Sequence, residues 1–195
     1  MENSMLSVSR SWIEAVWLAV AVFWFISAIS LKPVARRQST WSRMVEVVPL
    51  VLAAFLLFGS KPVSYLLNAR VLSHTPAVGW TGFLVTVAGA ALAIVARAIL
   101  GANWSGRVTI KQGHELIRRG PYAVVRHPIY SGLLLSVVGT AIAFGEVRHF
   151  LAIPLTFFGW WAKMQEEERL LTQEFGERYA AYQREVKGAI IPHIL

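Results

Sequence analysis

The chain has 195 residues, of which 55% are hydrophobic and 15% charged, and its formal net charge is +8. This composition, with a mean hydropathy of +0.51, excludes an ordinary soluble domain. The absence of cysteine excludes disulfides, thiolate metal sites and a cysteine nucleophile. Because Lys and Arg fall in the gaps between apolar runs, the positive charge indicates membrane topology and not nucleic-acid binding.

Five apolar stretches predict an all-α integral membrane protein of about five transmembrane helices. The first three spans are expected over about 13–31, 45–67 and 78–100, so that residues 1–100 form an N-terminal membrane region. Two shorter spans, about 128–145 and 150–161, are expected to form a short helical hairpin. Residues 101–195, which include this hairpin, form the predicted catalytic region.

Small residues recur about four apart in the third and fourth spans and predict faces where helices approach closely. They are Gly82, Thr86, Ala90 and Ala93, and then Gly132, Ser136 and Thr140. We expect these two ridges to frame a lateral opening towards the bilayer. Arg97 continues the first ridge and is expected to snorkel to the interface, the alternative being a position in a polar cavity.

The loops 32–43 and 101–127 and the tail 163–195 are richer in Lys and Arg than the loops between them. The positive-inside rule therefore predicts, in a cell or inner membrane, an outside N-terminus and a cytosolic C-terminus. The tail has apolar residues every three or four positions, which predicts an amphipathic helix, and Gly176 is expected to break it. The long loop and the tail then share the cytosolic side, where we expect them to form one polar chamber.

Residues 113–132 concentrate His, Arg and Tyr between apolar runs. Pro128 suits the first turn of the fourth span, which places Arg126 and His127 at a helix N-terminus, where an anionic group is favoured. His114 and His127 are thirteen residues apart, unlike a helical zinc pair, and the chain has no Asp or Cys. We therefore expect no metal.

Three consecutive glutamates, Glu166, Glu167 and Glu168, follow the fifth span. On a helix they point in different directions, so that at most two enter a common pocket, and the alternative is a solvated face. Carboxylates beside a membrane need a cationic partner, which a cationic ligand or the Arg-rich loop supplies. Arg118 and Arg119 are interpreted as topology signals.

The motifs HELIRRGPYAVVRHPIYSG (114–132), EEERLLTQEFGERYAAY (166–182) and LGANWS (100–105) resemble the isoprenylcysteine carboxyl methyltransferase family of integral membrane enzymes. The resemblance implies that S-adenosylmethionine is the cofactor and that the loop and the tail enclose it. By position, the family's cofactor contacts fall on His114, Glu115, Leu116, Ile117, Tyr122, His127, Pro128, Ile129, Tyr130 and Glu167. Lys163 stands where eukaryotic members have a substrate-site Arg, and it keeps the charge but lacks the bidentate fork.

The chemistry of these residues agrees with what the resemblance implies. Arg126, His127 and the helix N-terminus suit the cofactor's carboxylate, Glu167 suits its ammonium group, and Tyr122 or Tyr130 suits its adenine. Methyl transfer mainly requires alignment in a water-poor pocket. A carboxylate acceptor is ionised at neutral pH and needs no base, whereas an amine or thiol would need one. Glu168 is the first candidate for that base, and Arg126 and Glu168 are the candidate catalytic residues.

The predicted function is transfer of a methyl group from S-adenosylmethionine to a lipid-like acceptor, preferably a carboxylate as in an isoprenylcysteine. Alternatives are a lipid amine or thiol methyltransferase and a membrane reductase of the sterol-reductase type. A non-enzymatic alternative is a protein whose basic loops hold anionic lipid headgroups. The expected partners are an isoprenoid-like acceptor and the membrane, without nucleic acid or metal.

Overall fold

The structure is a computed structural model that describes residues 10–28, 40–59, 64–101, 104 and 116–192. These residues form helices, turns and one isolated bridge between Arg70 and Glu146, which confirms an all-α fold for them. The helices are α1 (Arg10–Ser27), α2 (Thr40–Phe58), η2 (Leu66–Asn68), α3 (Pro76–Leu100), η4 (Gly120–Ala123), α4 (Pro128–Phe144), α5 (Val147–Phe175) and α6 (Glu177–Glu185).

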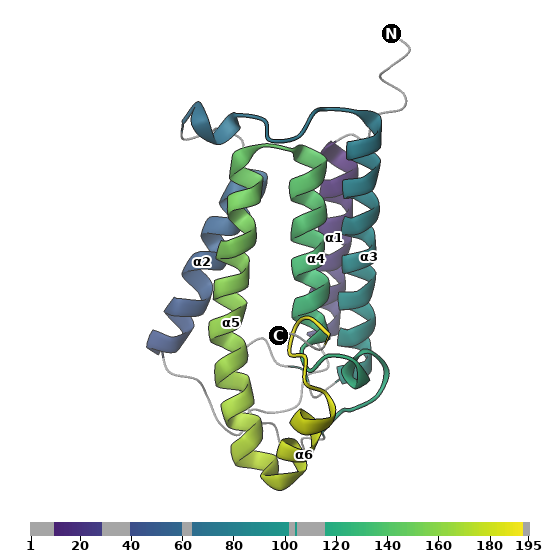
Figure 1. The fold of residues 1–195 in the computed structure, drawn as a ribbon, viewed down its shortest axis with the longest axis vertical. Helices are drawn as coiled ribbons and strands as arrows, with labels where there is room; N and C mark the ends of the chain where they lie inside the picture. Colours follow the sequence, from purple (N-terminus) through teal and green to yellow (C-terminus); the bar gives the residue numbers. More distant parts are fainter. Residues whose placement is uncertain (1–9, 29–39, 60–63, 102–103, 105–115, 193–195) are drawn as a thin grey trace.

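The long helices form a bundle in which α4 lies beside α3 and α1, and α2 lies beside α5 (Figure 1). The most extensive interface joins α3 to α4, and the next joins α2 to α5. At one end of the bundle α5 projects past its neighbours, and α6 folds back beneath it (Figure 1). The loop that precedes α4 lies at this same end, so the fold places loop, α5 and α6 together.

The small-residue ridges of α3 and α4 face each other in backbone contact. A Cβ added at Gly89 would lie 2.5 Å from the carbonyl oxygen of Gly132, and one at Gly139 would lie 2.4 Å from the amide nitrogen of Thr86. This confirms that the ridges are helix-contact faces. It also corrects the expectation of a lateral opening framed by them, because glycines this close leave no space between α3 and α4.

The helical hairpin of α4 and α5 turns at Gly145, whose φ of 69° suits glycine. Its second arm is not short: α5 has 29 residues and runs unbroken to Phe175. The fall in hydropathy after Trp161 therefore marks the end of the apolar part of α5 and not the end of the helix. The first break is Gly176, with φ 52°, as predicted.

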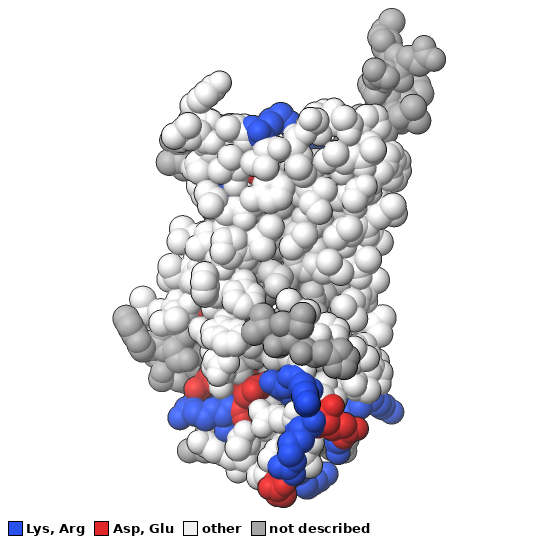
Figure 2. Space-filling view, in the orientation of Figure 1, with Lys and Arg blue, Asp and Glu red and all other residues white. Residues whose placement is uncertain are grey.

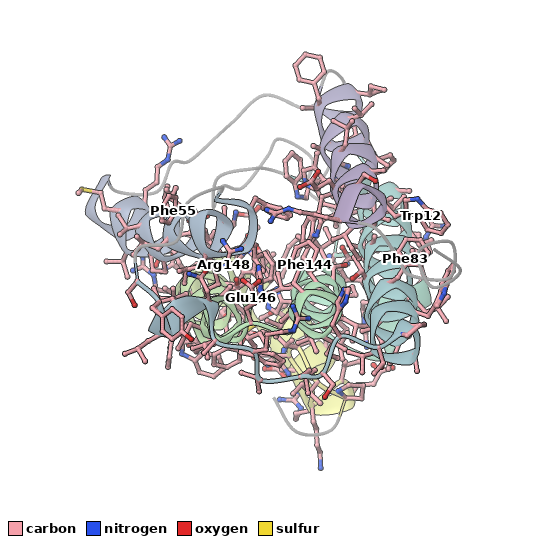
Figure 3. The ribbon with its side chains drawn as sticks, turned by 90° about the horizontal axis from the view of Figure 1, so that it is seen from above. Trp12, Phe55, Phe83, Phe144, Glu146 and Arg148 are labelled. Atoms are coloured by element: carbon pink, nitrogen blue, oxygen red, sulfur yellow. The ribbon has the colours of Figure 1, made fainter. Side chains whose placement is uncertain are left out.

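The bundle has an apolar middle and a charged end. Lys, Arg and Glu gather at the end that carries α6, whereas the middle of the visible face is almost free of them (Figure 2). Trp12 and Phe55 are about half exposed, and the Trp12 ring lies against Phe83 of α3 with centroids 5.8 Å apart (Figure 3). By length and composition, α1 and α3 are able to cross a membrane, and α4 is a shorter apolar helix. The five-span count and its orientation remain predictions.

Arg97 does not snorkel to the interface, because its side chain is almost fully buried, at 2% exposed. It donates to the carbonyl oxygens of Ser27 (2.8 Å) and Gly101 (2.9 Å), and its guanidinium lies 4.4 Å from the ring centroid of Trp104. The carbonyls at the C-terminal ends of α1 and α3 lack intrahelical donors, and one guanidinium satisfies both ends. This interaction holds Arg97 inside the bundle.

Candidate active site

The backbone just before α4 is held by the C-terminal segment 186–190, which runs alongside it. The amides of Arg126 and His127 donate to the carbonyls of Gly188 (3.0 Å) and Ala189 (2.8 Å), and the Ser131 hydroxyl donates to that of Ile190 (2.5 Å). Pro128 occupies the first turn of α4, and His127 is the N-cap without a side-chain capping bond. The first amides of α4 are thus left for an external acceptor.

The His127 imidazole lies between two carboxylates of α5. Its Nε2 is 3.1 Å from Glu168 Oε1, and its Nδ1 is 3.6 Å from Glu167 Oε2. Burial disfavours the charged imidazole, but the hydrogen bonds and negative charges of the two glutamates outweigh this effect and raise the pKa of His127. The site therefore favours the protonated imidazole more than water does.

The same interactions lower the pKa of both glutamates, which lie beyond the apolar part of α5. Burial favours their neutral form, but hydrogen bonds from His127 and Arg126 outweigh it and lower the pKa of Glu168 to about 2. Hydrogen bonds from His127 and Tyr130, with the Lys163 charge, lower that of Glu167. Both carboxylates are therefore anions.

Arg126 joins three segments of the chain. Its Nε donates to Glu168 Oε1 (2.8 Å), and its Nη1 donates to the carbonyls of Val186 (2.8 Å) and Lys187 (2.6 Å). Gln183 of α6 also donates to Glu168, across 3.1 Å. The loop, α5 and the C-terminal segment therefore meet at one ion pair, as expected for one polar chamber.

Tyr130 connects this charged cluster to the apolar bundle. Its hydroxyl donates to Glu167 Oε1 (2.7 Å), and its ring stacks between His127 and Trp160 with centroid distances of 5.7 and 5.8 Å. Lys163 Nζ lies 6.0 Å from the same ring centroid. Lys163, the predicted substrate residue, is therefore next to the predicted cofactor residues.

The other predicted cofactor residues lie around the cluster as packing and backbone elements. Tyr122 is buried, and its carbonyl accepts a 2.6 Å hydrogen bond from Tyr182. Ile117 and Ile129 pack in the same hydrophobic cluster as Tyr122 and Tyr130, whereas Leu116 packs against the tyrosines of α6. His114 and Glu115 lie outside the described residues.

Only two of the three consecutive glutamates face the chamber, as the helical geometry predicts. Glu166 points to the other side of α5 and pairs with Arg169, across 2.7 Å. Arg118 is not only a topology signal, because it pairs with Glu185 and lies 5.4 Å from the ring centroid of Tyr182. The described residues contain no group of three or more His or Glu arranged to hold a metal ion.

Sequence reasoning missed three neighbours of the predicted site. Glu46 of α2 forms an ion pair with Lys163, Trp160 stacks on Tyr130, and Gln183 donates to Glu168. Glu46 had a detectable signal, since an acid inside an apolar run demands a partner. Trp160 and Gln183 carry no such signal, because their contacts depend on how α5 meets α4 and α6.

Residues 80–173 match the isoprenylcysteine carboxyl methyltransferase (ICMT) family. Over these residues the chain is similar to this family. The match contains α3, α4 and most of α5, including Arg126, His127, Tyr130, Glu167 and Glu168. This match confirms the resemblance on which the predicted site rests, and the matched family is a family of methyltransferases.

Several similar proteins are named as isoprenylcysteine methyltransferases. A probable protein-S-isoprenylcysteine O-methyltransferase of Oryza sativa subsp. indica is 28% identical over 116 residues, covering 58% of this chain and 61% of the relative. The Tribolium castaneum protein-S-isoprenylcysteine O-methyltransferase is 33% identical over 119 residues, which cover 58% of this chain and 41% of that protein. The human protein-S-isoprenylcysteine O-methyltransferase is 31% identical over 109 residues, which cover 54% of this chain and 38% of that protein. The chain thus matches less than two thirds of each relative.

A solved structure is similar over most of the chain. It is the eukaryotic intramembrane Ras methyltransferase ICMT without a monobody, and it is 26% identical to this chain with a TM-score of 0.50. The similarity covers 82% of this chain and 55% of that one. The family fold therefore extends beyond the segment that the family match contains.

Proposed function

We propose that this chain is an integral membrane methyltransferase that moves a methyl group from S-adenosylmethionine to the carboxylate of an isoprenylcysteine-like lipid. The observation that carries the proposal is the buried His127 imidazole held between Glu167 and Glu168, at the N-terminus of α4 and beside Arg126. The family match over residues 80–173 and the names of the similar proteins support the reaction class.

The residues of the chamber fit a ligand that carries both signs of charge. The α4 amides and Arg126 suit a carboxylate, Glu167 suits an ammonium group, and the faces of Tyr122 and Tyr130 suit an aromatic ring. Bound S-adenosylmethionine supplies an electrophilic methyl on a sulfonium sulfur, which keeps the electron pair of the broken bond when the methyl–oxygen bond forms. Where water is excluded, the main requirement is alignment of the methyl donor with the acceptor. The buried cluster provides this alignment in our proposal.

The charge balance of the cluster favours a carboxylate acceptor. With His127 protonated, the cluster holds three cations (Arg126, His127 and Lys163) and three anions (Glu46, Glu167 and Glu168). S-adenosylmethionine brings one net positive charge, and a carboxylate acceptor brings one negative charge, so that the filled chamber is neutral. A neutral amine would leave one uncompensated charge, which is costly where water is excluded.

The site residues have distinct proposed roles. His114, Glu115, Leu116, Ile117, Tyr122, His127, Pro128, Ile129, Tyr130 and Glu167 form the cofactor side. Arg126 and Glu168 hold the loop against α5 at the reacting end, and Lys163 binds the acceptor carboxylate. A carboxylate needs no base, so that Glu168 acts as an anion and its pKa of about 2 suits this role. We further propose five spans with the N-terminus outside and this site on the cytosolic side.

The test uses membranes that contain the full chain, methyl-labelled S-adenosylmethionine and an N-acylated S-farnesylcysteine. We expect transfer of a base-labile label, because the product is an ester. Calorimetry of the purified protein is expected to detect binding of S-adenosylhomocysteine, the demethylated product. A base-stable label would instead indicate an amine or thiol acceptor, and absence of binding would exclude the methyltransferase.

A further inference from the structure

Glu46 and Lys163 form a buried ion pair between two helices that are distant in the chain. Glu46 lies in the first turns of α2 and Lys163 beyond the middle of α5, and Oε1 and Nζ are 3.1 Å apart. Their side chains are 8% and 10% exposed. A buried ion pair is no more stabilising than well-packed apolar side chains, so that its presence indicates a use other than stability.

The pair borders the chamber. Lys163 Nζ lies 6.0 Å from the ring centroid of Tyr130, whose hydroxyl donates to Glu167 across 2.7 Å. The Lys163 charge also acts on the Glu167 carboxylate. The ammonium therefore pairs with the acid of α2, and its charge also acts on the acid of the cofactor side.

A lysine in this position needs an anchor. The lysine ammonium is a compact charge at the end of a flexible four-carbon side chain. Near a membrane, such a side chain extends towards the interface. A carboxylate on α2 holds the ammonium inwards, above Tyr130. Because an ammonium donates in three directions, one group is able to bridge Glu46 and a second carboxylate.

We propose that Glu46 is a positioning residue of the acceptor subsite, which acts by holding the Lys163 ammonium where it receives the acceptor's carboxylate. This inference rests on the proposed function. Glu46 lies outside residues 80–173, so that the family match does not contain it. The proposal therefore assigns α2 a part in acceptor recognition in addition to its packing against α5.

The test measures the steady-state kinetics of the purified full chain with an N-acylated S-farnesylcysteine. Glu46→Gln keeps the shape but removes the charge, and we expect the KM for the acceptor to rise about tenfold or more. We expect kcat and the affinity for S-adenosylhomocysteine to change less than about threefold, since only acceptor binding is lost. Glu14→Gln is the matched control, because it removes a carboxylate that also pairs with a basic residue, Arg10, but on the half-exposed surface of α1.

Two further variants separate positioning from a general effect on folding. If Glu46 acts through Lys163, the double variant Glu46→Gln, Lys163→Gln is no worse than Lys163→Gln alone, and additive losses would overturn the inference. The exchange Glu46→Lys, Lys163→Glu keeps the pair and its net charge but moves the ammonium to α2. We expect it to show the raised KM, and a wild-type KM would overturn the inference.

The remaining outcomes separate this inference from the proposed function. Wild-type kinetics in Glu46→Gln, in a chain that methylates the acceptor, would overturn the role of Glu46 and leave the function standing. Lost S-adenosylhomocysteine affinity in Glu46→Gln would show a structural role and also overturn it. A wild-type chain that neither binds S-adenosylhomocysteine nor forms the ester would overturn both.

Discussion

Arg126 and Glu168 form an ion pair with Nε and Oε1 2.8 Å apart, although they are separated by 42 positions in the chain. The pair joins the start of α4 to the polar half of α5. Because the same guanidinium also donates to the carbonyls of Val186 and Lys187, it closes the C-terminal segment over the site. The chamber is therefore held from three directions by one side chain.

Replacing Arg126 with Ala is expected to lower the Tm by about 5–10 °C, because the mostly buried Glu168 loses its guanidinium partner and two carbonyls lose their donor. Thermal denaturation of the purified protein in detergent measures this change. Arg169→Ala is the control, since Arg169 pairs with Glu166 but is 62% exposed, and its Tm is expected to equal that of the wild type. Equal effects of the two substitutions would contradict the role of Arg126.

His127→Ala and Glu167→Gln are each expected to abolish S-adenosylhomocysteine binding in calorimetry while the protein stays folded. The first removes the cation at the N-terminus of α4, and the second removes the anion that Tyr130 and His127 hold in place. Glu174→Gln, an exposed acid on the same helix, is expected to bind as the wild type does. Retained affinity in both site variants would place the cofactor elsewhere.

The pH dependence of stability follows from the shifted groups. The pKa of His127 is raised above its usual 6.5. Its contribution to the free energy of unfolding is therefore complete below pH 6.5 and is lost as the pH rises through the higher folded-state pKa. The difference in Tm between wild type and His127→Gln should therefore shrink on the alkaline side. A difference that grew with rising pH would mean that the folded protein holds a neutral imidazole.

Glu168 titrates on the opposite side of the pH range. Its pKa is lowered from 4.5 to about 2. Its contribution to the free energy of unfolding is therefore complete above pH 4.5 and is lost between pH 4.5 and about 2. The Tm difference between wild type and Glu168→Gln should stay constant from neutral pH down to about pH 4.5 and then decrease. A decrease that begins near pH 7 would contradict the ion pair with His127 and Arg126.

The contact of α3 with α4 is expected to reject any side chain at its glycines. A Cβ at Gly89 would lie 2.5 Å from backbone atoms of α4, so that Gly89→Val should lower the Tm strongly or prevent folding, as overpacking costs about 1–3 kcal/mol or more. Ala91→Val also introduces an isopropyl side chain, two residues away on the exposed side of α3, and should be tolerated. Expression yield and Tm of the two variants decide this prediction.

Local patterns in the sequence determined much of this protein, because helix periodicity and hydropathy are properties of neighbouring residues. They predicted the apolar helices, the small-residue ridges, the first turn of α4 at Pro128 and the break at Gly176. The charge pattern of the loops and the family resemblance also predicted that the loop before α4 and the glutamates after Trp161 belong to one site. These features require no knowledge of which helix lies opposite which.

The tertiary structure decided the matters that depend on such partners. It showed that the ridges of α3 and α4 close on each other, that Arg97 caps two helix ends instead of reaching the interface, and that α5 continues through its charged residues. It also paired Lys163 with Glu46, from a helix outside the family match. A buried charge is stable only beside its counter-charge, and because that partner comes from a distant segment, only the packing of the helices determines it.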